Sequence, residues 1–259
     1  MNYRYHKQIL LASVRELPRA ELAQLLYLVY FNRCFRNNIF KRGEVIFHPK
    51  KLKGHPITIR RGTTDIDILL DLIAFERYMP EGCNDFDKAV FDLGANIGAT
   101  TSHFALAFPQ AQIIAVELEH SNFNIALRNT SFAGQKVKLI QGAVWKSDEM
   151  VSFAGNKADA FAVSNEGAAG IKAKAYTMNS LCEKYSISEI DFVKMDIEGA
   201  EKQVILEGNT EWLKKVKRII IEIHSAEYKE PIAQILSKYK FQVSETNKHW
   251  CGLTAYKSE

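Results

Sequence analysis

One stretch of this chain, Ala89 to Gly98, limits the possible folds more than any other. It begins with a short apolar run, which is typical of a buried strand in a parallel sheet. An acid and two glycines follow in the pattern Gly94-x-Asn96-x-Gly98, and Ala99 to Ala105 can then form a helix. Glycines let the backbone turn sharply and let a ligand approach without meeting a Cβ atom. A strand, a glycine turn and a helix in this order are the layout of a nucleotide-type cofactor site.

Two acids stand where such a site would use them. Asp92 lies at the end of the strand, two residues before the first glycine, where its carboxylate can accept a hydrogen bond from a ligand amine. A second apolar strand, Ile113 to Val116, ends at Glu117. Glu117 follows Gly98 at about the 20-residue spacing at which an acid binds a ribose hydroxyl pair. The sequence therefore predicts a cofactor site with Asp92 and Glu117 among its ligands.

Four stretches of the chain, taken together, resemble one enzyme family. They are Asp92 to Gly98, Phe108 to Glu117, Ile59 to Asp65, and Asp191-Phe192-Val193-Lys194-Met195-Asp196-Ile197-Glu198-Gly199-Ala200-Glu201. All four are similar to motifs of the FkbM family of class I methyltransferases, which depend on S-adenosylmethionine (SAM), and the last is the most specific. The resemblance runs from about Ile57 to Tyr256, so the first fifth of the chain lies outside it.

The fold expected from the residues agrees with the fold that the resemblance implies. After residue 89, apolar strand segments alternate with helical segments, which indicates a parallel sheet covered by helices. The resemblance implies an α/β, Rossmann-like class I methyltransferase fold. This fold has a mostly parallel seven-stranded sheet with helices on both faces and a terminal antiparallel hairpin. Two further helices are predicted at His6–Leu17 and Arg19–Phe35. We therefore expect an N-terminal helical extension, residues 1–56, and a SAM-dependent methyltransferase domain, residues 57–259.

The resemblance also implies which residues bind the cofactor. SAM is the expected methyl donor and S-adenosylhomocysteine the product. We expect Asp92 to hold the methionyl amine and Glu117 the ribose hydroxyls, and related methyltransferases contact the adenine near the equivalents of Gly142 and Ala143. The expected SAM-binding residues are Asp92, Gly94, Asn96, Gly98, Glu117, Leu118, Gly142, Ala143 and Asp196.

Acids and a histidine follow two later strands of the predicted sheet. Asp196 follows the strand at 190–195, and Glu222 and His224 stand at the end of the strand at 216–223. Ends of parallel strands meet at one rim of a sheet, and residues 222 and 224 of a strand point to the same side. We expect His224 to be the general base for an acceptor hydroxyl, since a neutral imidazole can take up a proton near neutral pH. Asp196 would orient the acceptor or the base, with Glu222 in support.

Two alternatives to this base stay open on the sequence. Asp196 is itself a candidate base, and the acids could instead hold a divalent ion that lowers the pKa of the hydroxyl. The sequence assigns no metal ligands, and the need for a divalent metal is undecided.

The resemblance implies O-methylation of a hydroxyl on a sugar, a glycolipid, a polysaccharide or a secondary metabolite. An NAD(P)-dependent Rossmann oxidoreductase is an alternative, although it usually carries G-x-G-x-x-G and a small apolar residue where Asp92 stands. A non-catalytic module that binds SAM or a partner is another. We expect a small-molecule or glycan acceptor and no nucleic acid, because no Pro-Pro pair follows Met195 and the net charge of +4 is modest.

The cysteine spacing and the apolar and polar stretches of the chain bear on metal and disulfide content, membrane association and mobility. The four cysteines lack C-x-x-C spacing, which argues against a zinc cluster or a disulfide framework and suits a reducing cytoplasm. The most apolar stretch, Leu22 to Phe31, is about half as long as a bilayer span requires, so we expect no membrane span and a cytoplasmic location. This stretch predicts core packing or a homodimer contact through the N-terminal helices. The small, polar segment 154–170 predicts a mobile loop.

Overall fold

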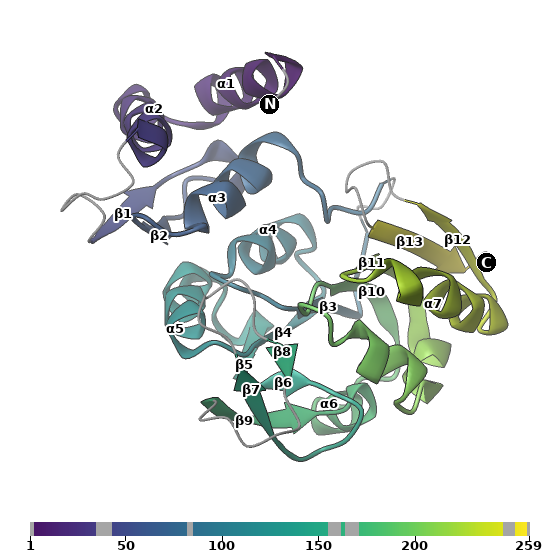
Figure 1. Cartoon of the computed structure of the whole chain (residues 1–259). Coiled ribbons are helices and arrows are strands. Elements are labelled where there is room, and N and C mark those ends of the chain that lie inside the picture. The colour runs from purple at the N-terminus through teal and green to yellow at the C-terminus, as the bar shows by residue number, and fades with distance from the viewer. Residues whose placement is uncertain are drawn as a thin grey trace.

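A seven-stranded sheet lies at the centre of the chain, in a computed structural model that describes residues 3–34, 43–81, 85–154, 162–163, 171–245 and 252–257 (Figure 1). The strands in spatial order are β12 (Phe241–Glu245), β13 (Gly252–Lys257), β11 (Val216–Glu222), β10 (Ile190–Met195), β3 (Ala89–Leu93), β4 (Gln112–Glu117) and β5 (Val137–Gln141). Neighbours pair in parallel, except that β13 runs antiparallel to both β11 and β12. The predicted α/β fold with its terminal hairpin is confirmed.

Both faces of this sheet are covered, which explains why its strands read as continuous apolar runs. Successive residues of β3 enter different cores: Phe91 belongs to the apolar cluster that includes Leu181 and Leu236, whereas Val90 belongs to the cluster that includes Phe104. The helices concerned are α4 (Ala99–Ala107), α5 (His120–Asn129), α6 (Met178–Lys184) and α7 (Ala226–Lys238). Shorter helical segments are η2 (Lys50–Leu52), η3 (Ser131–Lys136), η4 (Lys202–Leu206) and η5 (Glu211–Lys215). Of these, η4, which follows β10, is a short π-helical segment.

The N-terminal part shares a core with the sheet domain. It consists of α1 (Tyr3–Glu16), α2 (Arg19–Cys34), β1 (Glu44–Phe47), β2 (Ile57–Arg60) and α3 (Asp65–Ala74). β1 and β2 form an antiparallel pair. Leu25 of α2 belongs to the same apolar cluster as Leu69 of α3 and Ile97 of the glycine turn. The predicted domain boundary after residue 56 stays a prediction, and the structure pairs two strands across it.

The predicted homodimer contact falls on an exposed apolar surface. Leu10, Leu11 and Val14 of α1 and Leu26 and Tyr27 of α2 are exposed large apolar side chains. The contact itself stays a prediction. Of the helices that the structure describes, none has both the length and the apolar character that a bilayer crossing demands.

A second, smaller sheet lies beyond β5 (Figure 1). Its strands in order are β6 (Ala143–Val144), β9 (Ile171–Tyr176), β7 (Met150–Ala154) and β8 (Ala162–Val163). Within it, β7 and β9 form an antiparallel pair. Most of the predicted mobile loop, 154–170, lies outside the described residues.

Candidate active site

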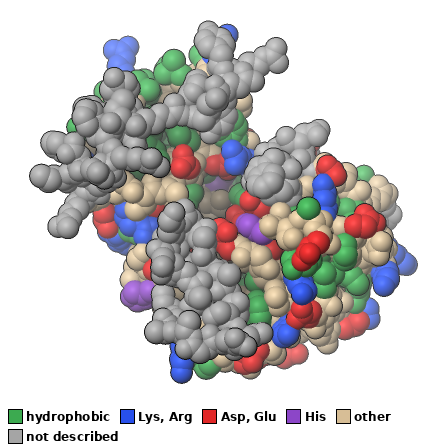
Figure 2. Space-filling view, viewed as in Figure 1, with side chains coloured by type: hydrophobic (Ala, Val, Ile, Leu, Met, Phe, Trp, Pro, Cys, Tyr) green, Lys and Arg blue, Asp and Glu red, His purple; other side chains and the backbone are tan. Residues whose placement is uncertain are grey.

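A cavity of about 260 Å³ opens at the carboxyl ends of β3, β4 and β10. Most of the predicted cofactor residues line it, namely Gly94, Asn96, Glu117, Leu118, Gly142, Ala143 and Asp196. Residues that were not predicted complete its wall: Val116, Asn122, Val144, Trp145, Ile197, Glu198, Gly199, Ala200 and Gln203. Figure 2 shows acidic and histidine side chains gathered around a hollow in the middle of the visible face.

The glycine turn is fixed by its neighbours on both sides. The N–H groups of Gly94 and Ala95 donate to the carbonyl oxygen of Val116, at 3.0 and 2.9 Å. Gly94 has φ +80°, and a Cβ atom on it would lie 1.8 Å from the carbonyl oxygen of Asp196. Only glycine therefore fits between β4 and the end of β10.

Glu117 stands at the cavity with both carboxylate oxygens held. Oε2 accepts from the N–H of Asn96 at 2.7 Å, and Oε1 accepts from the N–H of Glu119 at 2.8 Å. The side chain is only 6% exposed, and burial raises the pKa of Glu117 while these hydrogen bonds oppose the rise. Oε2 keeps acceptor capacity beyond its one N–H, whereas Oε1 also lies 3.5 Å from Nδ2 of Asn122. Oε2 can therefore accept from a further hydroxyl, which is compatible with the ribose prediction.

Residues of β2 and α3 are linked to Glu117 through hydrogen bonds of Asn122. Arg60 forms a bidentate ion pair with buried Asp65, with Nε–Oδ2 and Nη2–Oδ1 both at 2.8 Å. Its Nη2 also donates to Oδ1 of Asn122 at 2.5 Å. Asn122 in turn donates from Nδ2 to Oε1 of Glu117 at 3.5 Å. The upstream motif thus reaches the cavity through one asparagine.

The predicted contact of Asp92 with the ligand amine stays a prediction, and the structure shows which groups of the chain contact its carboxylate. Asp92 is fully buried and does not line the cavity. Its Oδ2 accepts from Oγ1 of Thr101 at 2.6 Å, and its Oδ1 lies 3.2 Å from Nζ of Lys194. Lys194 stands directly opposite Asp92 in the ladder of β3 and β10. Asp92 thus forms a buried ion pair with a lysine of its own chain.

Gly98 also lies outside the cavity. A Cβ atom on it would come within 3.0 Å of Cα and Cβ of Ala126 and 3.1 Å of Cγ2 of Thr130. The residue has φ +76° and precedes α4. Gly98 thus lets the start of α4 approach α5 closely, and its predicted contact with the cofactor stays a prediction.

Lys194 is a functional candidate that the sequence reading missed. Only 3% of its side chain is exposed, and Nζ donates to the carbonyl oxygens of Gly94 at 2.5 Å and Leu93 at 3.3 Å. Burial alone would lower the pKa of Lys194, but the charges of Asp92 and Asp196 outweigh it and the pKa is raised. The ammonium group therefore stays charged and ties the glycine turn to Asp196, whose Oδ2 lies 3.8 Å away. A lysine inside a strand buried on both faces is the clue that could have found it.

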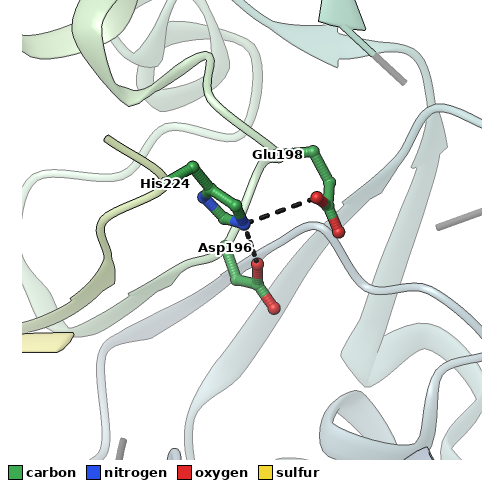
Figure 3. A group of neighbouring side chains, drawn as sticks. All are labelled: Asp196, Glu198 and His224. Carbon is green, nitrogen blue, oxygen red and sulfur yellow. Dashed lines mark ion pairs between the residues drawn. The ribbon is translucent and has the colours of Figure 1, made fainter. Parts of the chain in front are cut away.

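The predicted catalytic residues meet in a cluster that we call the acid rim: Asp196, Glu198, Glu201 and Glu222 around His224. Nδ1 of His224 lies 3.0 Å from Oε1 of Glu201. Its Nε2 faces Glu198 at 3.4 Å, Asp196 at 3.7 Å and Glu222 at 3.9 Å. Figure 3 shows the Asp196 and Glu198 carboxylates directed at the same edge of the ring. The structure thus brings His224, Asp196 and Glu222 together as predicted, and adds Glu198 and Glu201.

This environment changes the proton affinity of the histidine. Burial alone would lower the pKa of His224. Its bond to Glu201 and the charges of Glu201, Asp196 and Glu198 outweigh burial and raise the pKa to about 9. Burial, together with the charge of Asp196, raises the pKa of Glu198 to about 7, against an opposing effect of His224. At neutral pH the rim therefore holds His224 mainly as an imidazolium.

Tyr78 is the other group that the sequence reading missed. It lies between α3 and β3, far from the motifs, and its hydroxyl is 2.6 Å from Oε2 of Glu222 and 2.9 Å from Oδ2 of Asp196. Burial and the charges of Asp196 and Glu222 raise the pKa of Tyr78 well above its ordinary value, so the hydroxyl keeps its proton. No local sequence pattern marks this tyrosine.

A divalent ion has one plausible place in the described part of the chain. One ligand-type atom each from Asp196, Glu198 and His224 lies within 4.8 Å of the others. Carboxylates and imidazoles are suitable ligand types for such ions. A protonated His224 already supplies a positive charge at this point. A bound ion is therefore an alternative to the imidazolium.

Comparison with known proteins gives a family match over the same region. Residues 92–245, more than half of the chain, match the model of the methyltransferase FkbM domain. The chain is also similar to a hexuronic acid methyltransferase, AglP, of Haloferax volcanii, with 28% identity over 163 residues. That alignment covers 62% of this chain and 66% of the relative.

Solved structures resemble the chain more distantly. A precorrin-6y C5,15-methyltransferase from Geobacter metallireducens has a TM-score of 0.42 and 12% identity, with 71% of this chain and 85% of that chain covered. A fibrillarin pre-rRNA processing protein from Methanococcus jannaschii has a TM-score of 0.44 and 13% identity, with 86% of each chain covered. These values are too low for the neighbours' activities to bear on this chain.

Proposed function

This chain belongs to the FkbM methyltransferase family, and from that premise we propose that it transfers the methyl group of SAM to a hydroxyl of a sugar or glycan. The observation that carries the proposal is the juxtaposition of two sites. The cavity with Glu117 and the acid rim with His224 meet at Asp196, which lines the one and faces the other.

The cavity fits a nucleoside that bears an amino-acid tail. Glu117 offers its carboxylate to a ribose diol, and Gly142 and Ala143, next to it in the wall, let a ligand approach closely. When bound, SAM supplies a methyl group already activated by its sulfonium. The chain then has to align donor and acceptor, and such orientation can supply roughly 7–11 kcal/mol of the barrier.

The acid rim supplies the proton acceptor. Neutral His224 takes the hydroxyl proton at Nε2, because Nδ1 is engaged by Glu201. The resulting imidazolium is stabilised by the four carboxylates around it. Asp196, at the mouth of the cavity, orients the acceptor hydroxyl, and Glu222 supports His224. A base placed in this way contributes typically about 10²–10⁴-fold to the rate.

The acceptor class comes from the relative. A hexuronic acid methyltransferase acts on a sugar acid, so uronic acids and their glycosides are the first acceptors to test. The experiment incubates the purified chain with isotope-labelled methyl-SAM and a panel of hexuronic acids, neutral sugars and secondary-metabolite hydroxyls. Methyl ethers of sugars support the proposal. Methylation of only non-sugar hydroxyls in the panel would contradict the acceptor class.

Replacement of Glu117 by alanine should weaken binding of S-adenosylhomocysteine by at least about tenfold. The variant loses two hydrogen bonds to a charged acceptor, each worth roughly 1.5–3 kcal/mol, and about 1.4 kcal/mol already equals tenfold. Calorimetry measures the affinity, with Glu227→Ala, an exposed glutamate of α7, as the control. Unchanged affinity in Glu117→Ala would show that the ribose lies elsewhere.

The melting temperature distinguishes the alternative functions. If NAD and not SAM raises the melting temperature, the chain is a dehydrogenase. If SAM binds but no methyl group is transferred, the chain is a non-catalytic binding module.

Methyl transfer should be slow at neutral pH and rise with pH. His224 acts only when neutral, and with a pKa of about 9 roughly one molecule in a hundred is neutral at pH 7. The rate of the chemical step should therefore rise about tenfold per pH unit from pH 7 and level off above about pH 9. Single-turnover rates at saturating SAM give the profile. A rate that does not change between pH 7 and 9 would remove His224 as the base.

A further inference from the structure

A second cavity, of about 330 Å³, lies against the sheet at its terminal hairpin. Its floor is one face of β11, β13 and β12, and the segment 79–81, from the connection that follows α3, forms its side (Figure 1). The other face of the hairpin is covered, because Leu253 and Ala255 belong to the same apolar cluster as Leu236 of α7. We call this second cavity the hairpin groove. It shares no lining residue with the cavity at Glu117.

Polar side chains of three neighbouring strands gather on the floor of the hairpin groove. Arg218 of β11 stands directly opposite Tyr256 of β13, and Thr254 of β13 stands opposite Ser244 of β12. All four residues line the groove. Opposite residues of paired strands share a face, as do alternate residues of one strand. A guanidinium group, an aromatic ring and two hydroxyls therefore lie together on one side of the sheet.

These polar groups have capacity left for a ligand. The guanidinium carbon of Arg218 lies 5.8 Å from the ring centroid of Tyr256, and Arg218 forms no ion pair with any residue that the structure describes. The hydroxyls of Ser244 and Thr254 have no hydrogen-bond partner in the described part of the chain. The groove thus presents one cation and two hydroxyls that the described residues do not satisfy.

Two acids also line the hairpin groove, and both are engaged with other groups. Oε1 of Glu245 accepts from Nζ of Lys229 at 2.5 Å. Glu81 has an interaction of its own, and neither acid forms an ion pair with Arg218. The positive charge of Arg218 is therefore available to an anion that enters from solvent.

An acidic sugar fits this set of groups. A guanidinium group binds a carboxylate through two parallel hydrogen bonds. Serine and threonine hydroxyls both donate and accept, so they can pair with sugar hydroxyls in either sense. The ring of Tyr256, which is 41% exposed, offers an apolar surface on which the C–H face of a sugar ring can pack. A neutral sugar would leave the guanidinium group without an anion, so the groove favours an acidic one.

The hairpin groove and the acid rim lie along the same face of β11. Arg218 and Glu222 are separated by an even number of residues in this strand, so they point to the same side. At about 3.3 Å per residue, they stand about 13 Å apart. Glu222 faces His224 at the rim. This separation is longer than one sugar ring, so a sugar in the groove and a sugar at His224 are different residues of one acceptor.

We propose that the hairpin groove binds an acidic sugar residue of an oligosaccharide acceptor, with the carboxylate of that residue on Arg218. Another residue of the same oligosaccharide then presents its hydroxyl to the acid rim. The proposal rests on the proposed function for the sugar class of the acceptor. It adds that the acceptor has at least two sugar residues and that one of them, away from the methylated hydroxyl, is acidic.

The test compares Arg218→Gln with Arg128→Gln. Calorimetry without SAM measures the binding of two acidic probes, trigalacturonic acid and a hyaluronan tetrasaccharide, and of a neutral one, maltotriose. Arg218→Gln should weaken the binding of an acidic probe at least about tenfold, because hydrogen bonds between two charged groups are lost. Arg128 of α5 is an exposed arginine bonded to Glu44, so Arg128→Gln removes the same charge elsewhere and should leave this binding unchanged. Melting temperatures and affinities for S-adenosylhomocysteine equal to those of the wild type show that both variants are folded.

Three results would overturn the proposal: no binding of either acidic probe to the wild type, equally tight binding of maltotriose, or unchanged binding of the acidic probes in Arg218→Gln. The binding measurement needs no methyl transfer, so it is independent of the proposed function. Binding that depends on Arg218 in a chain that methylates nothing would sustain the groove while refuting the proposed function. Methylation of sugars that is equally efficient in Arg218→Gln, with an unchanged KM for acidic oligosaccharides, would sustain the function while refuting the groove.

Discussion

His224→Ala should slow the methyl-transfer step by on the order of 10²-fold or more, which is the contribution of a well-placed general base. The variant removes the one side chain that the acid rim surrounds, and neither Asp196 nor Glu222 then has a cation at Nε2 to stabilise. The affinity for SAM should be kept, because His224 does not line the cavity. Single-turnover measurements at saturating SAM, over a range of pH, isolate the chemical step.

The controls for this variant separate three accounts of the base. His48→Ala removes another histidine whose Nδ1 faces a glutamate, Glu21 at 2.8 Å, next to β1 and far from the rim, and should leave the rate unchanged. A loss of less than about threefold in His224→Ala would eliminate this histidine and favour Asp196 as base. Inactivation of the wild type by a chelator, with rescue by Mg²⁺, would favour a divalent ion at the rim.

Gly94→Ala should destabilise the chain by more than about 3 kcal/mol and abolish binding of S-adenosylhomocysteine. A Cβ atom at this position would lie 1.8 Å from the carbonyl oxygen of Asp196, a backbone atom that cannot move without the end of β10. Large losses of this kind come from strained backbone and steric overlap, and each strained residue alone costs about 1–3 kcal/mol. Urea unfolding measures the stability, and calorimetry measures the binding.

Gly54→Ala is the matched control for this substitution. Gly54 has φ +79°, almost the angle of Gly94, but no heavy atom lies within 4 Å of the Cβ that would be added. Its loss of stability therefore reports the cost of the left-handed backbone alone. The excess loss in Gly94→Ala measures the close approach to Asp196. Equal losses in the two variants would mean that the turn has room to relax, and the tight fit of β3 to β10 would be refuted.

The elements of the fold could be predicted because their causes are local. Buried parallel strands need short apolar runs, and Ala89–Leu93 and Ile190–Met195 have them. The glycine turn could be placed because few other residues tolerate the backbone angle of Gly94. After β10 the chain turns through Glu198 and Gly199, both at positive φ, before the short helical segment η4.

Much of the site depends on contacts that no local pattern records. The ligand contact expected of Asp92 stays a prediction, but its ion pair with Lys194 could not be foreseen, because it depends on the register of β3 and β10. Register is decided by the packing of whole strands, and one residue of slip would reverse the result. Tyr78 lies more than a hundred residues from Asp196 in the sequence, and only the path of the connection after α3 brings it to the rim. The expected grouping of Asp196, Glu222 and His224 held, because strand ends of a parallel sheet share one edge.

The buried pair of Asp92 and Lys194 restricts how this chain can diverge. Loss of either partner leaves an unpaired charge in the core, which costs roughly 3–5 kcal/mol, about the margin by which many domains stay folded. Replacement of both by apolar residues could keep the core, yet it would also remove the ammonium group that holds the carbonyl of Gly94. Neither residue can therefore be substituted alone without a large loss of stability. Among descendants of this sequence, the two should persist together or change together.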